Sequence, residues 1–197
     1  MRSDQISPVV IAAALNACAL EPESLNSERI EQRFGSYGID LLQYAAGVRR
    51  SSLYSLAGEI RICRTYAVVR FEEQLAPSVA AAHAEVIAGQ SIGATFKSGG
   101  WKIGKETLYV GALSLDSADH PITRLMHLGD GAQLAMHAYR LGLERDSLAM
   151  DYATIVEVHH PDYLTPDELA SLYADSKQTA TPGPAAHDLR SLVLDAD

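Results

Sequence analysis

The sequence contains little of what marks several large classes of protein. Two cysteines in 197 residues are too few for a disulfide framework, and no CxxC pattern suggests a zinc site. Basic residues are also in the minority, 16 against 25 acidic ones, and the net charge is -9. Nucleic-acid affinity depends on clustered cations that neutralise phosphates. We therefore expect a protein of the reducing cytoplasm with no nucleic-acid partner.

Long hydrophobic runs are missing as well. The most apolar stretch, residues 8–20, is too short to span a bilayer. A secretory signal that ends at Cys18 is the alternative. Against it, the positive charge of Arg2 is offset by the negative charge of Asp4, and no clear small-residue cleavage site follows. We favour a first amphipathic helix over residues 6–19, capped by Ser7. No membrane partner is expected.

The motifs of several common reactions are absent too. The serines have no G-x-S-x-G elbow, and the histidines show no HxH or HExxH spacing on one element. The pair Gly99-Gly100 and the spacing Gly35-x-x-Gly38 lack the strand-to-helix context of phosphate-binding loops. We expect these glycines in turns and the histidines in ordinary hydrogen bonds. The sequence predicts no metal and no cofactor.

What the chain does contain is the composition of a globular protein. Hydrophobic residues make up 47% of it, and its mean hydropathy is near zero. A chain of this length can form one well-buried core but is short for two. The end of the chain is rich in threonine, proline, glycine and alanine, which favours a flexible tail. We predict a single domain over residues 1–175 and a flexible C-terminal tail over residues 176–197.

Turn residues and hydrophobic periodicity indicate an α+β protein. Consecutive strands are joined as hairpins, without the alternating crossover helices of a parallel sheet. We therefore predict an antiparallel sheet with helices mainly on one face. After the first helix, the expected elements are a helix at 26–34, strands at 39–45, 48–56 and 59–70, helices at 77–88 and from 91, a strand at 101–115, an irregular segment at 116–131, strands at 133–143 and 147–160, and a helix at 165–174.

One strand of the predicted hairpin carries an unusual charge. Because strand side chains alternate, Arg64 shares a face with Tyr66 and Val68. A buried guanidinium needs a carboxylate of the protein or an anionic ligand. Both a structural ion pair and a ligand site therefore remain open. Arg49 and Arg50 begin the partner strand, and alternation requires that they point to opposite faces.

Glu157 is the second unusual placement, because both faces of its strand look covered. It shares one face with Ala153, Ile155 and His159, and the residues of the other face are largely apolar. Desolvation favours the protonated form of a carboxyl group, which is the usual preparation of a general acid. The alternative is a carboxylate that pairs with Arg64 and does nothing else.

Several segments, in this order, resemble the chorismate pyruvate-lyase family between residues 27 and 161. Ser27-Glu-Arg-Ile-Glu-Gln-Arg-Phe-Gly35 and the strand after it are similar to the family's opening helix and first strand. Val48-Arg-Arg50, the turn at residues 57–59 and Arg64-Thr65 resemble its arginine, its turn and its G-R-T return strand. Gln90-Ser-Ile-Gly93 resembles its P-L-G helix opening, and Ile155-Val-Glu157-Val-His-His-Pro161 resembles its closing T-E-x-F-x-P strand.

The resemblance implies a chorismate lyase-like fold, which is shared with the effector-binding domain of a class of transcription regulators. It also implies site residues. Arg50 and Arg64 would bind carboxylates, a backbone amide at Ile92 would contribute, and Glu157 would sit at the reacting centre. Arg49 competes with Arg50, because the hairpin differs in length by about one residue and such a slip reverses the face.

Three functions are compatible with these predictions. The first is a cofactor-free lyase that eliminates pyruvate from chorismate or a related small carboxylate and leaves a hydroxybenzoate. The second is a noncatalytic sensor or binding domain for a small anionic carboxylate, without a DNA-binding segment. The third is a structural role in which the buried charges merely pair. For the first two, we predict that Arg64 and Glu157 share one enclosed pocket, with Arg50 or Arg49 at its rim or floor.

Overall fold

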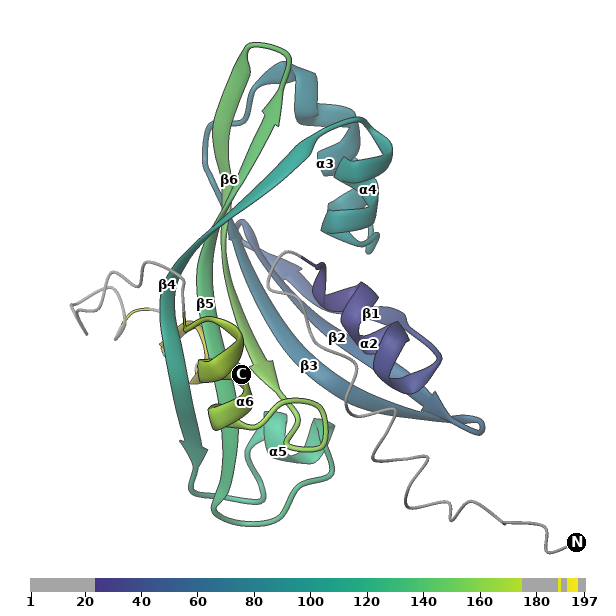
Figure 1. Ribbon diagram of the computed structural model, residues 1–197, viewed down its shortest axis with the longest axis vertical. Coiled ribbons are helices and arrows are strands. Elements are labelled where there is room, and N and C mark those ends of the chain that lie inside the picture. Colours follow the sequence, from purple (N-terminus) through teal and green to yellow (C-terminus); the bar gives the residue numbers. More distant parts are fainter. Residues whose placement is uncertain (1–23, 175–187, 189–190, 195–197) are drawn as a thin grey trace, which may run out of the picture.

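The computed structural model describes residues 24–174, 188 and 191–194. They form an α+β structure around a six-stranded antiparallel sheet with the strand order β1-β2-β3-β6-β5-β4 (Figure 1). The predicted fold class is confirmed. The strands are β1 (Gly38–Ala45), β2 (Val48–Ala57), β3 (Ile60–Phe71), β4 (Lys102–Leu115), β5 (Ala132–Arg145) and β6 (Leu148–His159).

The helices connect and cover these strands. They are α2 (Asn26–Phe34), the 3-10 turn η1 (Pro77–Val79), α3 (Ala80–Ile87), α4 (Ile92–Ser98), α5 (Pro121–Leu125) and α6 (Pro166–Leu172). No described helix is long and apolar enough to cross a membrane. The predicted helix at residues 6–19 lies outside the described residues. The segment 116–131, predicted to be irregular, contains the short α5, which Pro121 begins.

Local sequence signals account for most element ends. The turn between β1 and β2 places Ala46 and Gly47 at φ values of 49° and 74°, the left-handed backbone that a tight hairpin turn needs. Helix α2 ends at Gly35, whose φ is 74°. The Thr165 side chain accepts a hydrogen bond from the Glu168 backbone, and the Glu168 side chain accepts one from Thr165, which is the predicted capping box of α6.

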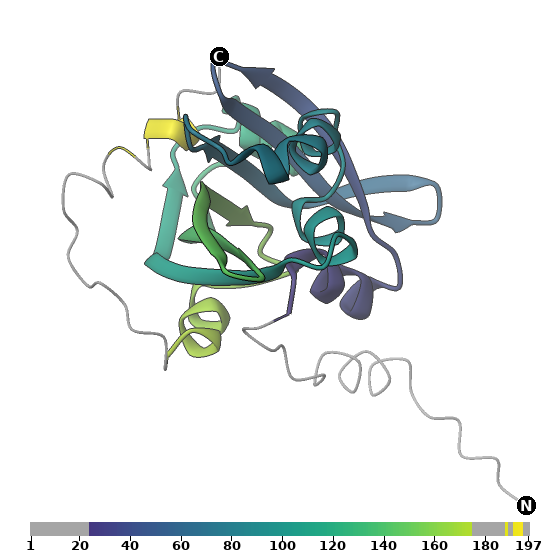
Figure 2. The same cartoon turned by 90° about the horizontal axis from the view of Figure 1, so that it is seen from above.

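The two faces of the sheet are covered differently. Helices α2, α3, α4 and α6 lie on one face, and Figures 1 and 2 show α2 and α4 next to each other. Their approach is close, since a Cβ atom at Gly93 of α4 would collide with the Leu25 side chain. The opposite face carries an apolar cluster of Cys63, Tyr66, Val68, Leu113, Leu115, Ile122, Met126, Leu134, Met136, Ala138, Val156, Val158 and Val193. Helices are therefore gathered mainly on one face, as predicted.

Part of the predicted tail belongs to this apolar cluster. Residues 191–194 are helical, and Val193 is fully buried. The Leu192 carbonyl also accepts a hydrogen bond of 3.0 Å from Arg50 Nη1. The expectation of a flexible tail is therefore wrong for these four residues, and most of the remaining tail lies outside the described residues. Sequence pattern missed the contact because one buried valine on a single helical turn has no periodicity to detect.

A β-bulge changes the direction of one predicted site residue. Leu53 of β2 pairs with Thr65 of β3, whereas the next residue, Tyr54, pairs with Cys63, so that Arg64 is the extra residue. The alternation is interrupted there. The Arg64 guanidinium consequently lies 3.8 Å from the ring centre of Phe34 in α2, on the helix-covered face. The predicted shared face with Tyr66 and Val68 is wrong for this reason.

Candidate functional site

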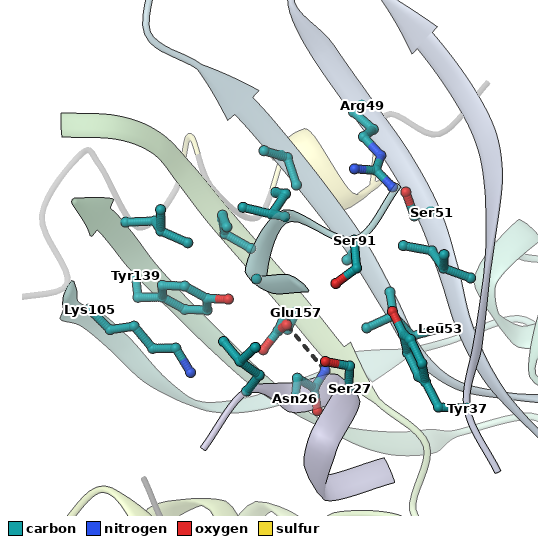
Figure 3. Close-up of a pocket in the computed structure, with 18 residues that line it drawn as sticks. Asn26, Ser27, Tyr37, Arg49, Ser51, Leu53, Ser91, Lys105, Tyr139 and Glu157 are labelled. Carbon is teal, nitrogen blue, oxygen red and sulfur yellow. Dashed lines mark hydrogen bonds between the residues drawn. The ribbon is translucent and has the colours of Figure 1, made fainter. Parts of the chain in front are cut away.

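A pocket lies on the helix-covered face, between the sheet and helices α2 and α4 (Figure 3). The empty space between its lining residues, including the part that is open solvent, is about 570 Å³. Its apolar lining consists of Leu25, Ile39, Leu53, Ala67, Val69, Ile92, Leu141 and Ile155, and Gly93 completes the wall. Its polar lining consists of Asn26, Ser27, Tyr37, Arg49, Ser51, Ser91, Lys105, Tyr139 and Glu157.

Arg49 is the buried cation on the β2 side of the pocket. It is opposite Val69 of β3 and only 1% exposed. Its guanidinium donates to the backbone carbonyls of Gln90, at 2.9 Å, and Gly89, at 3.3 Å. Its Nε has no hydrogen-bond partner, and no ion pair within the described residues involves it. Burial lowers the pKa of Arg49, because desolvation disfavours the charged guanidinium.

Like the Nε of Arg49, a second polar group in this part of the pocket has no hydrogen-bond partner among the described residues. Ser51, two residues further along β2, projects to the same face and is buried. Its hydroxyl oxygen makes no hydrogen bond within the described part of the chain. Buried polar groups are nearly always hydrogen-bonded. The Arg49 end of the pocket therefore has hydrogen-bonding capacity that the protein itself does not use.

Arg50 points away from the pocket. It pairs with Val68 of the apolar face, its Nε donates to Gln43 at 3.1 Å, and its Nη1 donates to the Leu192 carbonyl. The structure thus decides between the two adjacent arginines. Arg49 lines the pocket, and Arg50 lies on the other side of the sheet.

Glu157 lies on the sheet floor of the pocket and is 4% exposed. Its Oε1 accepts a hydrogen bond of 3.1 Å from Asn26 Nδ2, and Asn26 Nδ2 also donates to Thr65 Oγ1 at 3.1 Å. Tyr163 donates to Asn26 Oδ1 at 2.6 Å. This last bond orients the amide, since it occupies the oxygen and leaves the NH₂ group toward Glu157.

Lys105 of β4 reaches the pocket from the side opposite to Arg49 (Figure 3). Its Nζ donates to the Ser24 carbonyl at 3.1 Å and lies 5.6 Å from the ring centre of Tyr139. Burial lowers the pKa of Lys105 to about 8, although the charge of Glu157 acts in the opposite direction. Burial also raises the pKa of Tyr139, together with the charge of Glu157 and a hydrogen bond to it.

A buried polar layer continues below the pocket, under α2 and α6. Arg29 is 1% exposed and donates to the Tyr173 hydroxyl at 3.2 Å. His137 and His159 are fully buried, and burial lowers the pKa of both, to about 3 for His137. These two histidines are therefore neutral. The balance of charge around Glu157 is positive, with Arg49 and Lys105 in the pocket wall and Arg29 behind it.

The predicted ligand-binding arginine Arg64 is not among the residues that line the pocket. Its Nε donates to Ser55 at 2.9 Å, and its Nη1 lies 3.9 Å from a carboxylate oxygen of the exposed Asp162. The prediction that Arg64 and Glu157 share one pocket is wrong. The bulge brings Arg64 to the helix-covered face, but its guanidinium packs on Phe34 at the C-terminal end of α2, whereas the pocket lies at the N-terminal end of that helix. Of the predicted site residues, the structure brings together Arg49, Ile92 and Glu157.

Sequence reasoning missed three residues that matter to the geometry: Asn26, Lys105 and Tyr139. Alternation could have found the lysine, since Lys105 shares a strand face with Ile103 and Thr107. Asn26 gave no such signal, because its partners Glu157 and Tyr163 are far away in the chain. No group of three or more metal-binding side chains occurs among the residues described.

Comparisons with known proteins add little to this geometry. No protein-family model matches the chain, and no curated protein matches it. Among solved structures, it is similar to a transcriptional regulator of the GntR family from Enterococcus faecalis V583, with a TM-score of 0.36 and 12% sequence identity. That match covers 66% of this chain and 92% of the regulator chain. A likeness at this TM-score does not establish a shared fold.

Proposed function

We propose that the protein binds a small organic carboxylate in this pocket, with Arg49 holding the carboxylate. The observation that carries the proposal is the buried guanidinium of Arg49, which has two backbone carbonyl acceptors and no carboxylate partner among the described residues. Two charge-assisted hydrogen bonds to a ligand carboxylate would satisfy it. The unpartnered Ser51 hydroxyl beside it would donate to the same ligand oxygen atoms.

The rest of the pocket supports a ligand with an apolar body. Small-molecule sites typically combine apolar walls with a few polar groups. Leu53, Val69 and Ile155 belong to such apolar walls. The hydroxyl groups of Tyr37, Ser51 and Ser91 lie at the Arg49 side in Figure 3. A hydroxybenzoate matches this arrangement, because its planar ring is apolar and its carboxylate and hydroxyl group are polar.

A second candidate is catalysis, and the position of Glu157 favours it. In a chorismate lyase-like reaction, the ring loses a proton and becomes aromatic while the carbon–oxygen bond to the enolpyruvyl group breaks. Glu157 in the pocket floor would hold or move that proton. The carboxylate-binding roles that the family resemblance gives to Arg50 and Arg64 would fall here to Arg49 and Lys105.

Calorimetric titration with 4-hydroxybenzoate and with its neutral analogue 4-hydroxybenzamide tests the binding proposal. We expect the acid to bind and the amide to bind much more weakly. Arg49→Met should weaken binding of the acid by about 10- to 150-fold, since hydrogen bonds to a charged group contribute about 1.5–3 kcal/mol. Arg50→Met is the matched control, because its side chain lies on the other face of the sheet, and it should leave binding unchanged.

Equal binding of the acid and the amide would contradict the proposal, and so would a larger loss in Arg50→Met than in Arg49→Met. Catalysis is tested separately by incubating the protein with chorismate and following the absorbance of an aromatic product. If the protein is a lyase, Glu157→Gln keeps binding of 4-hydroxybenzoate and loses turnover. If the unaltered protein forms no product, the catalytic proposal is wrong, and the binding proposal is unaffected.

A further inference from the structure

We propose that Lys105 is a carbonyl-capturing amine, which condenses reversibly with an aldehyde or ketone group of the ligand to form an imine. The inference rests on the proposed function, because it takes the same pocket as the ligand site, and it adds a chemical class to the ligand: a carboxylate that also carries a carbonyl group. No step assigned to the pocket so far uses the amine of this lysine as a nucleophile.

The surroundings of Lys105 differ from those of the other described lysines. Lys97 pairs with Glu28 at 2.7 Å and Lys102 with Glu144 at 3.4 Å, and both are largely exposed. Lys105 lines the pocket, and no carboxylate lies within ion-pair distance of it among the described residues. Its hydrogen bond goes instead to the backbone carbonyl of Ser24. An amine held in this way keeps its position whether it is charged or neutral.

The groups that face Lys105 can serve the proton transfers of imine formation. The carboxylate of Glu157 and the hydroxyl of Tyr139 both point toward the centre of the pocket, as does the Lys105 side chain (Figure 3). The lone pair of Nζ forms the bond to the carbonyl carbon, and the carbon–oxygen bond then breaks. The two amine hydrogens leave with that oxygen as water. Glu157 would accept each proton from the nitrogen and pass it to the oxygen, with the Tyr139 hydroxyl as a relay that gives up one proton as it takes another. Both side chains then end in the protonation states in which they began.

Burial keeps part of the Lys105 amine neutral near physiological pH, and the neighbouring charges act in both directions. The titratable and charged groups that act on it are Glu28 and Arg29 of α2, Lys97 of α4, Tyr139 and His137 of β5, and Glu157 and His159 of β6. Burial is the largest influence and lowers the pKa of Lys105 to about 8. Imine formation should therefore accelerate as the pH rises and level off above about pH 8, well below the value of about 10.4 for an exposed lysine.

The experiment uses 4-formylbenzoate, whose carboxylate and aldehyde lie at opposite ends of the ring, as Arg49 and Lys105 lie on opposite sides of the pocket (Figure 3). Reduction with cyanoborohydride converts an imine into a stable amine, which peptide mapping by mass spectrometry locates. We expect a single adduct at Lys105 in the unaltered chain. Lys105→Arg, which keeps the positive charge, should lose it, and Lys102→Arg, a change on the same strand, should keep it.

Labelling of Lys97, Lys102 and Lys105 to the same extent would overturn the inference, and so would an adduct that persists in Lys105→Arg. If Lys105→Arg does not fold, the mapped position of the adduct in the unaltered protein still decides the matter. A labelling rate at Lys105 that keeps rising up to about pH 10, the usual value for lysine, would also contradict it.

Failure of this inference can be told apart from failure of the proposed function by adding benzaldehyde, which has no carboxylate. If 4-hydroxybenzoate binds through Arg49 but neither aldehyde labels Lys105, carboxylate binding stands and imine formation falls. If benzaldehyde labels Lys105 as well as 4-formylbenzoate does, and Arg49→Met changes neither rate, the amine is reactive and the carboxylate site is wrong.

Discussion

Val156 and Glu157 are neighbours in β6 and face opposite sides of the sheet. Val156 is part of the apolar cluster with Val68 and Ala138, whereas Glu157 lies in the pocket and takes a hydrogen bond from Asn26. The same alternation separates Arg50 from Arg49 in β2. One face therefore buries mainly hydrocarbon, and the other buries charges and hydroxyl groups together with apolar side chains beneath helices. The comparison indicates that substitutions on the apolar face should change stability, and substitutions on the pocket face should change binding first.

The largest effect on stability is expected from the apolar face. Leu134 is fully buried in that cluster, and Leu134→Ala should lower the free energy of unfolding by about 2–5 kcal/mol, because the cavity left behind is only partly filled. Denaturant unfolding measures this loss. Binding of 4-hydroxybenzoate by the folded fraction should not change, and a loss of binding as large as that of Arg49→Met would show that the two faces are not independent.

A smaller effect is expected from the amide that bridges the pocket and the polar layer. Asn26→Ala removes the donor to Glu157 and Thr65 and leaves the Tyr163 hydroxyl without its acceptor, which should cost about 1–3 kcal/mol of unfolding free energy. The matched control on the apolar face is Thr123→Val in α5. The Thr123 hydroxyl is buried and has no partner among the described residues, so this change should be neutral or stabilising.

Thermal or denaturant unfolding of both variants at one pH measures this difference. A destabilisation of Thr123→Val as large as that of Asn26→Ala would break the contrast between the two faces, because it would mean that buried hydroxyl groups matter equally on both.

The smallest effect concerns pH and the buried histidines of the pocket face. Burial depresses the pKa of His137 to about 3, below the ordinary histidine value of about 6.5. Between these values the unfolded chain binds a proton that the folded chain does not, so that stability falls as the pH falls. The protonation of His137 in the unfolded chain should lower the free energy of unfolding by about 1 kcal/mol between about pH 6.5 and about pH 5.5. Denaturant unfolding at several pH values measures the slope.

Replacing this histidine should remove that part of the slope. His137→Gln is the test variant, and His127→Asn is the control, because His127 is exposed and asparagine tolerates its positive φ of 54°. If the slope of stability against pH is unchanged in His137→Gln, His137 gains its proton in the folded protein as well. The buried polar layer would then be more accessible to water than its burial indicates.

Local pattern predicted much of the fold and only part of the site. The hairpins, the helix that ends at Gly35 and the capping box at Thr165 are decided within a few residues, and the structure confirms them. Alternation also placed Glu157 on the face of Ile155 and His159. It failed at Arg64, where one extra residue in β3 turns the side chain toward α2. A bulge of this kind has no marker in the sequence around Arg64.

The sequence by itself determined that the chain folds into hairpins of an antiparallel sheet, that Arg49 and Arg50 face opposite sides, and that Glu157 shares a face with Ile155 and His159. These are consequences of short-range sterics and of the two-residue period of a strand. Only the tertiary structure decided that Arg49 and not Arg50 lines the pocket, and that Lys105 and Glu157 line it together. The reason is that a period specifies which side chains share a face, whereas the face that a helix covers depends on contacts between residues far apart in the chain.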